Sequence, residues 1–153
     1  MKKIKSFTVD HDLIGKGIFL SRTDRNTYTL DIRLAVPNRE SVKPEALHTL
    51  EHLGATYLRN SAFSDSVVYF GPMGCLTGCY AVFFDDISYA DAIKLIRDAF
   101  EFASDFEGKI PGAERRECGN YLFHDLDEAK KTARAFLEVT NGWDEKRLAY
   151  PSK

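Results

Sequence analysis

The feature that most limits the possible folds is the alternation of polar and apolar residues in the segment from position 27 to position 36. The apolar members are Tyr28, Leu30, Ile32, Leu34 and Val36, and the polar members between them are Thr29, Asp31 and Arg33. A period of two places these groups on opposite faces of a strand. Such a half-buried strand is typical of an antiparallel sheet with one face on the core and one toward water.

Three helices and two further strands are expected elsewhere. Pro44 suits a first helical turn, and that helix is expected to run to about Asn60. Ser88 with Asp91 resembles a capping box at the start of a second helix, and Asp125 is expected to cap a third over residues 126–139. Strands are predicted over residues 66–70 and 79–84. Because these elements do not alternate as β-α-β units, the pattern predicts one α+β domain over residues 1–153, with helices packed on an antiparallel sheet.

Composition excludes several function classes. The formal net charge of −2 over 153 residues gives no general attraction to nucleic acid or anionic membranes. There is no apolar run near the roughly 20 residues that span a bilayer, and the basic N-terminus lacks the apolar segment of a signal peptide. Three cysteines are an odd number, which disfavours a disulfide framework and favours a reduced cytoplasmic setting.

The residues with the clearest chemistry are His48, Glu51 and His52 in the first predicted helix. Histidines at i and i+4 lie on one face of a helix, so both imidazoles can bind one metal ion. Glu51 lies about 100° around the helix from His52, beside the metal, where a general acid or base is useful. The order H-x-x-E-H is the inverted form of the zinc-protease motif.

A catalytic metal site commonly has three protein ligands and one open position. Cys118, between Glu117 and Gly119, is the best third candidate, and the alternative is a buried inert thiol. Cys75 lies in a glycine-rich loop where a thiol can be exposed and activated, and the alternative is a turn residue without chemistry. Cys79 is interpreted as core filler. His124 is interpreted as a loop residue, and the alternative is a residue that supports the metal ligands.

Together these motifs resemble one family, the LuxS-type S-ribosylhomocysteine lyases. The resemblance rests on residues 48–52, 71–75, 77–78 and 117–121, with support from residues 6–7, 10–11 and 31–33, and motif order and spacing agree over essentially the whole chain. It implies a LuxS/processing-peptidase-like α-β layer architecture and a homodimer with its active sites at the interface. It also implies a lyase that moves a carbonyl along the ribose and then eliminates homocysteine, leaving 4,5-dihydroxy-2,3-pentanedione, the autoinducer-2 precursor of quorum sensing.

The resemblance also implies roles for individual residues. One Fe(II) per subunit, replaceable by zinc or cobalt, is expected on His48, His52 and Cys118. Cys75 and Glu51 are expected to be catalytic. The residues expected to bind substrate are Ser6, His11 and Arg33.

Two positions depart from the family pattern, which usually has arginine after the catalytic cysteine and an aromatic residue three positions later. This chain has Leu76 and Cys79. Activity is expected to survive, with altered electrostatics and looser packing near Cys75. Two alternative functions are an H-x-x-E-H zinc peptidase and a non-catalytic metal- or sugar-binding relic. Release of homocysteine from S-ribosylhomocysteine would exclude the first as the main role, and binding without turnover would favour the second.

Overall fold

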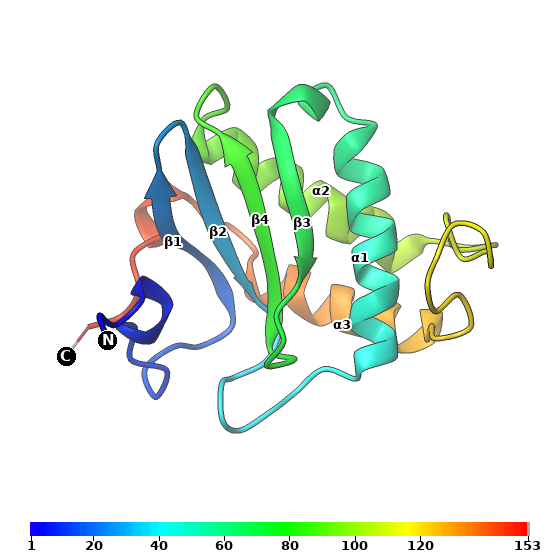
Figure 1. Ribbon diagram of the computed structural model, residues 1–153, viewed down its shortest axis with the longest axis horizontal. Helices are drawn as coiled ribbons and strands as arrows, with labels where there is room; N and C mark the ends of the chain where they lie inside the picture. The colour runs from blue at the N-terminus through cyan, green and yellow to red at the C-terminus, as the bar shows by residue number, and fades with distance from the viewer. Residues whose placement is uncertain (153) are drawn as a thin grey trace.

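A four-stranded antiparallel sheet forms one layer of the structure, with strand order β1-β2-β4-β3 (Figure 1). The strands are β1 (Gly17–Asp24), β2 (Thr27–Arg33), β3 (Val67–Pro72) and β4 (Gly78–Phe84). This computed structural model describes residues 1–152. The predicted strands over 66–70 and 79–84 correspond to β3 and β4, whereas β1 was not predicted.

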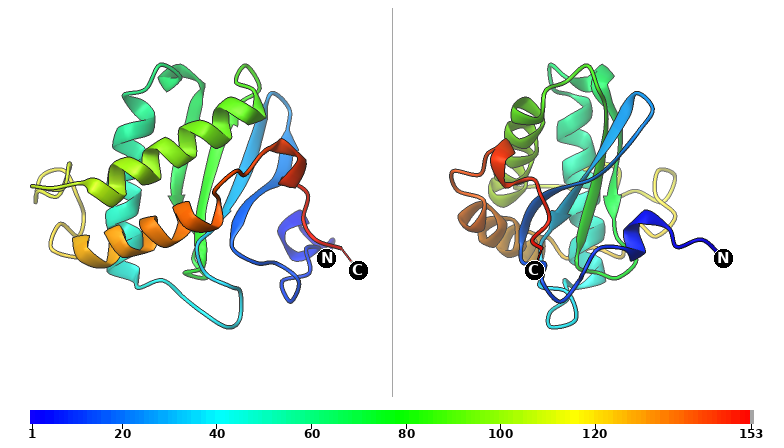
Figure 2. Two further views of the ribbon diagram at one scale, coloured as in Figure 1. Left: turned by 180° about the vertical axis from the view of Figure 1, so that it is seen from behind. Right: turned by 90° about the vertical axis from the view of Figure 1, so that its left-hand side faces the viewer.

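Three helices cover one face of the sheet, and the N-terminal turn lies on the other side (Figure 2). They are α1 (Pro44–Arg59), α2 (Tyr89–Asp105) and α3 (Leu126–Val139), and short 3-10 turns span Lys5–Phe7, Ser64–Ser66 and Glu145–Arg147. The sheet and all three helices contribute to one cluster of buried apolar side chains. The predicted α+β class, with an antiparallel sheet packed against helices, is confirmed.

The helix starts follow the predicted capping chemistry. The Ser88 hydroxyl accepts a hydrogen bond from the Asp91 backbone N–H at 3.1 Å, and the Asp125 carboxylate accepts one from the Glu128 N–H at 3.0 Å. Each cap satisfies one of the backbone donors that a helix start leaves without an intrahelical partner. Both helices therefore begin where the local sequence predicts.

The prediction for the alternating segment was wrong in two respects. The strand ends at Arg33 rather than at residue 36. Its polar face is also buried, since Asp31 is 1% exposed and Arg33 is 2% exposed. The reason is the C-terminal segment, which runs beside β1 and donates a hydrogen bond from the Tyr150 hydroxyl to Asp31. Charged residues are buried here because they are paired.

Among residues 1–152, every helix is too short or too polar to cross a bilayer.

Candidate metal centre

Helix α1 places His48 and His52 side by side on one face. Their rings are perpendicular with centroids 4.7 Å apart, and the two Nε2 atoms are 3.1 Å apart. Leu47 and Leu50 of the same helix are buried in the core, which sets the rotation of the helix and directs the histidines outward from it. The spacing in the sequence thus produces the predicted geometry.

Backbone carbonyls determine which ring nitrogen carries the proton. His48 Nδ1 lies 2.6 Å from the Phe123 carbonyl oxygen, and His52 Nδ1 lies 2.8 Å from that of Pro111. A carbonyl can only accept, so each Nδ1 donates and each neutral ring keeps a lone pair on Nε2. Two lone pairs that face each other at 3.1 Å repel unless a cation lies between them. The histidines therefore fit a metal ion, with the carbonyls fixing their orientation.

Cys118 brings a thiol to the same point from the loop before α3. Its Sγ lies 3.4 Å from His48 Nε2, and the Asn120 backbone N–H donates to that sulfur at 3.4 Å. The thiol is half-buried and lies beside the histidines. Imidazole nitrogen and thiolate sulfur are both ligands of divalent metals, and a set of three leaves a fourth position open, as in catalytic sites.

His124, which the sequence suggested was a loop residue, belongs to this cluster. The candidate donor atoms of His48, His52, Cys118 and His124 all lie within 4.8 Å of one another. The His124 ring stacks on His48 with centroids 4.1 Å apart, and its buried Nε2 is without a hydrogen-bond partner among the described residues. Burial, together with His48 and His52, lowers the pKa of His124 to about 4, so the ring is neutral.

The sequence offered one sign of this placement, which was not decisive: His124 directly precedes the cap residue Asp125. The Asp125 backbone N–H donates to the Thr49 hydroxyl at 3.1 Å. His124 Nδ1 lies 3.1 Å from the same hydroxyl. Thr49 stands between the two histidines of α1, so this shared anchor draws the start of α3 against the metal centre.

A cavity of about 320 Å³ opens beside the cluster. Its lining includes His48 and Glu51 from α1, Gly74 and Leu76 from the loop that joins β3 to β4, and Phe123. Glu51 therefore borders the same space as a candidate metal ligand. A mostly apolar pocket with a few convergent polar groups is typical of a small-molecule site.

Cys75 lies between Gly74 and Leu76, which both line this cavity, and is exposed. Its loop is tied to the segment after β2: the Thr77 carbonyl accepts from the Leu34 and Ala35 backbone N–H groups at 2.9 and 3.0 Å. Leu76 adopts a left-handed φ of 60°, which is uncommon for a residue other than glycine. The loop is thus a rigid support for the thiol.

The surroundings of Cys75 favour its thiolate. Its Sγ lies 3.0 Å from the Thr77 hydroxyl and 4.0 Å from Arg33 Nη1. Burial alone would raise the pKa of Cys75, but hydrogen bonds from Thr77 and the Arg33 guanidinium outweigh burial and lower it below the usual thiol value. A thiolate is the form that can act as a base or nucleophile.

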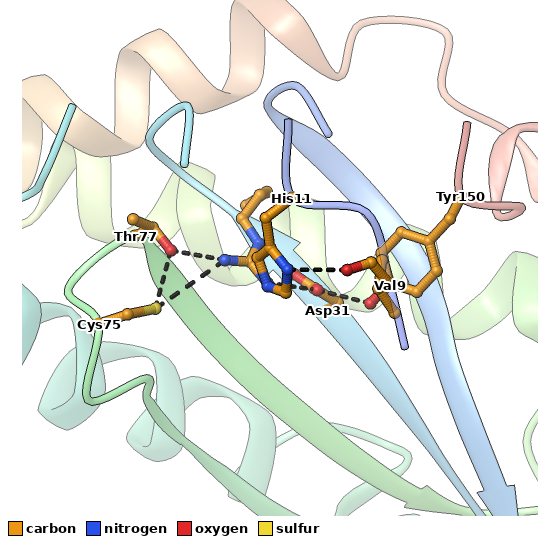
Figure 3. A network of polar contacts seen from close by, with 7 residues as sticks. Val9, His11, Asp31, Cys75, Thr77 and Tyr150 are labelled. Carbon is orange, nitrogen blue, oxygen red and sulfur yellow. Dashed lines mark hydrogen bonds and ion pairs between the residues drawn. The ribbon is translucent and has the colours of Figure 1, made fainter. Parts of the chain in front are cut away.

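Arg33 is held by a buried carboxylate. Its Nε and Nη2 donate to the two Asp31 carboxylate oxygens at 2.8 and 2.7 Å, which leaves Nη1 to the Thr77 hydroxyl and the Cys75 sulfur (Figure 3). The predicted substrate role of Arg33 stays a prediction, because most of its donors are already used within the protein.

The other two residues predicted to bind substrate lie in the N-terminal segment, and neither lines the cavity beside the metal cluster. Ser6 borders a separate cavity of about 180 Å³ with Tyr69 and Tyr80, on the sheet face opposite the helices. His11 Nδ1 lies 3.0 Å from the Val9 carbonyl oxygen (Figure 3). Their roles also stay predictions.

The two departures from the family pattern have different surroundings. Leu76 lines the cavity beside Met73 and makes that wall apolar. Cys79 is fully buried in the core, as expected of core filler, and burial raises the pKa of its thiol. Cys79 is therefore an apolar packing residue and not a second reactive thiol.

Comparison with known proteins agrees with this geometry. Residues 4–147 match the family model of S-ribosylhomocysteinase (LuxS). The chain is 48% identical over 160 residues to the S-ribosylhomocysteine lyase of Phocaeicola vulgatus, covering 100% of this chain and 99% of that protein. It is 47% identical over 159 residues to the S-ribosylhomocysteine lyase of Porphyromonas gingivalis, covering 99% of both chains. It is 45% identical over 157 residues to the one of Borreliella burgdorferi, covering 99% of this chain and 100% of that protein. The chain belongs to the LuxS family of S-ribosylhomocysteinases.

Proposed function

We propose that this protein is a carbon–sulfur lyase that converts S-ribosylhomocysteine to homocysteine and 4,5-dihydroxy-2,3-pentanedione. The observation that carries the proposal is the convergence of His48, His52 and Cys118 beside a cavity that Glu51 and the Cys75 loop also border. The relatives with similar sequences over their full length are named for this activity. One catalytic domain spanning the chain is the corresponding proposal for its organisation.

The metal would be held by His48, His52 and Cys118, and Fe(II) is the proposed ion, with zinc or cobalt as substitutes. When bound, such an ion supplies Lewis-acid polarisation of the sugar oxygens, which makes protons beside a carbonyl easier to remove. The protein's own part is to keep both Nε2 lone pairs aimed at one point through the Phe123 and Pro111 carbonyls.

Glu51 and Cys75 are the proposed proton carriers. The thioether at carbon 5 of the ribose breaks by β-elimination only when a carbonyl stands at carbon 3. Moving the carbonyl from carbon 1 to carbon 3 requires proton removal and return on neighbouring atoms, with no net oxidation. Two groups suit this task, because each contributes about 10²–10⁴-fold when positioned near the reacting carbon.

The final step needs a base at carbon 4. Removal of that proton forms a double bond between carbons 4 and 5, and the electron pair of the breaking carbon–sulfur bond leaves with homocysteine. The thiolate of homocysteine then takes a proton, and the enol product converts to the diketone. We assign the proton transfers to Cys75 and Glu51 jointly, since Glu51 borders the cavity and Cys75 lies between two residues that line it.

We also propose a cytoplasmic homodimer with its active sites at the subunit interface. Partly exposed residues of β3 and β4, including Tyr69, Tyr80 and Val82, border the second cavity on the open face of the sheet. Tyr69 is 49% exposed, and the N-terminal residues Ile4 and Phe7 are 55% and 66% exposed. Contiguous exposed apolar surface marks interaction sites.

The test is a thiol-release assay with S-ribosylhomocysteine under anaerobic conditions, with metal analysis of the same sample. The expected result is one homocysteine released for each S-ribosylhomocysteine consumed, with activity that depends on one metal ion per chain. Chelator-sensitive peptide cleavage without homocysteine release would instead support a peptidase. Ligand binding without turnover by metal-loaded protein would support a binding role.

A further inference from the structure

The C-terminal segment reaches the buried network around Cys75. The Tyr150 hydroxyl donates to an Asp31 carboxylate oxygen at 2.6 Å, across 119 positions of sequence (Figure 3). The same oxygen accepts from Arg33 Nη2 at 2.7 Å. A residue near the C-terminus therefore completes the hydrogen bonding of a buried charge pair.

The segment that carries Tyr150 is fastened to strand β1. The Leu20 backbone N–H donates to the Leu148 carbonyl at 2.8 Å, and the Trp143 indole N–H donates to the Ile18 carbonyl at 3.0 Å. The Tyr150 ring stacks on Phe19 with centroids 5.3 Å apart. The hydroxyl is thus delivered to Asp31 by a firmly packed ring and not by a free tail.

The hydroxyl remains a neutral donor. Burial, and then the Asp31 charge, raise the pKa of Tyr150 far above the usual phenol value. Asp31 and Arg33 side chains are 1% and 3% exposed, so water does not replace a lost partner easily. A buried carboxylate that loses one donor must draw its remaining donors closer or stay unsatisfied.

We propose that Tyr150 is a positioning residue, whose hydroxyl holds Asp31 and thereby keeps the Arg33 guanidinium beside the Cys75 sulfur. Tyr150 shares the Asp31 oxygen with Arg33, so its hydrogen bond limits how far the guanidinium is drawn toward Asp31. Arg33 Nη1 then stays at Thr77 and 4.0 Å from Cys75 Sγ. The inference rests on the proposed function for its biological meaning but not for its test.

The test is the pH dependence of Cys75 alkylation by iodoacetamide in the metal-loaded protein, followed by peptide mass spectrometry. Arg33 and Tyr80 are the titratable groups coupled to Cys75 among the described residues, and both have a pKa raised above their usual high values. Neither changes charge near neutral pH, so the midpoint reports the Cys75 thiol. This readout needs no substrate, so its outcome is independent of whether the protein is a lyase.

Tyr150→Phe keeps the stacked ring and removes only the hydroxyl. If Arg33 Nη1 moves about 0.5 Å from the sulfur, Coulomb's law at an effective dielectric constant of about 20 gives an upward midpoint shift of about 0.3 pH unit. Tyr57→Phe is the matched control, because the Tyr57 ring also packs on an aromatic ring, Phe102, at 5.4 Å, and lies outside this network. It should leave the midpoint unchanged.

A second pair of variants tests the route through Arg33. In an Arg33→Gln background, Tyr150→Phe should cause no further shift, since the guanidinium it positions is gone. An unchanged midpoint in Tyr150→Phe, with or without a lower melting temperature, would overturn the proposal. A shift of equal size in the Arg33→Gln background would overturn it too, because the effect would not pass through Arg33.

Discussion

At Cys75, neighbouring groups set the charge state of one sulfur atom. The Thr77 oxygen accepts a hydrogen bond from Arg33 Nη1, so its own proton is free to donate to the sulfur 3.0 Å away. Arg33 adds a positive charge at 4.0 Å. Thr77 and Arg33 do not become reactive themselves. Both stabilise the Cys75 thiolate, which is the form that moves protons.

Glu51→Gln and Cys75→Ala should each lower homocysteine release by about 10²–10⁴-fold while leaving the metal bound. The reason is that Glu51 borders the cavity, Cys75 lies between two residues that line it, and neither belongs to the cluster of candidate donor atoms. Thiol titration and elemental analysis of the same preparations give the two readings. Loss of metal in either variant would mean that a ligand had been mistaken for an acid or base.

His48→Ala and Cys118→Ala should show the opposite pattern, with metal lost. Each removes a donor atom from a point where two imidazole lone pairs and a thiolate meet, and a metal site depends on its ligand count. Metal affinity measured by competition with a chromogenic chelator checks this. Full metal content in Cys118→Ala would place the third ligand elsewhere, with His124 as the next donor in the cluster.

Thr77→Val should raise the pH midpoint of Cys75 alkylation by about one unit, because one hydrogen bond to a charged group is lost. The sign follows from the lowered pKa of Cys75: the thiolate persists to lower pH in the native protein, and removing a donor reduces its population near neutral pH. Thr132→Val is the control, since its hydroxyl donates to the Glu128 carbonyl within α3. Equal profiles for Thr77→Val and the native protein would contradict this account.

At the scale of elements, helix α1 connects the core to the chemistry. One side buries Leu47, Leu50 and Leu53, and the other presents His48 and His52. The close approach of α1 to β3 depends on Gly54, where an added Cβ would lie 2.4 Å from the Phe70 ring. The helix can therefore sit near enough to the sheet for Glu51 and the β3–β4 loop to border one cavity.

Gly54→Ala should lower the free energy of unfolding, although alanine is favoured over glycine in a helix interior by about 1 kcal/mol. Overpacking against a buried ring costs about 1–3 kcal/mol, so the net change is a destabilisation of about 1 kcal/mol. Urea unfolding measures it. In a Phe70→Leu background the same substitution should become neutral or stabilising, and a stabilising effect in the native background would refute the contact.

At the scale of the whole molecule, the two faces of the sheet have different partners. The helices cover one face, and the chain termini cover only part of the other (Figure 2). Residues of β3 and β4 on that second face remain accessible around the cavity that Ser6 borders. A twofold dimer would bury the same surface on both copies, which is the usual form of a homodimer interface.

The native protein should sediment at twice its chain mass of 17.3 kDa. Val82→Glu should shift it toward monomer, because a twofold interface would bring two added charges into an apolar contact. Val139→Glu, at a valine 38% exposed on α3, is the control and should remain dimeric. Analytical ultracentrifugation distinguishes these outcomes, and a native protein at the single-chain mass would rule out the dimer.

The sequence by itself determined the structural features that depend on neighbours within about four residues. The bounds of α1 and α3, the Ser88 and Asp125 caps, and the pairing of His48 with His52 follow from helical spacing and local hydrogen bonds. Cys118 and Cys75 could be selected by their residue type and their glycine neighbours, before their distances to the histidines were known.

Only the tertiary structure decided the contacts that join distant segments. His124 enters the metal cluster because Asp125 and Thr49, 76 positions apart, share a hydrogen bond. The polar face of β2, predicted to face water, is buried because Tyr150 reaches Asp31 from 119 positions away. No local spacing rule encodes such pairs, since they form only where packing of the core brings the segments together and pairs each charge as it is buried.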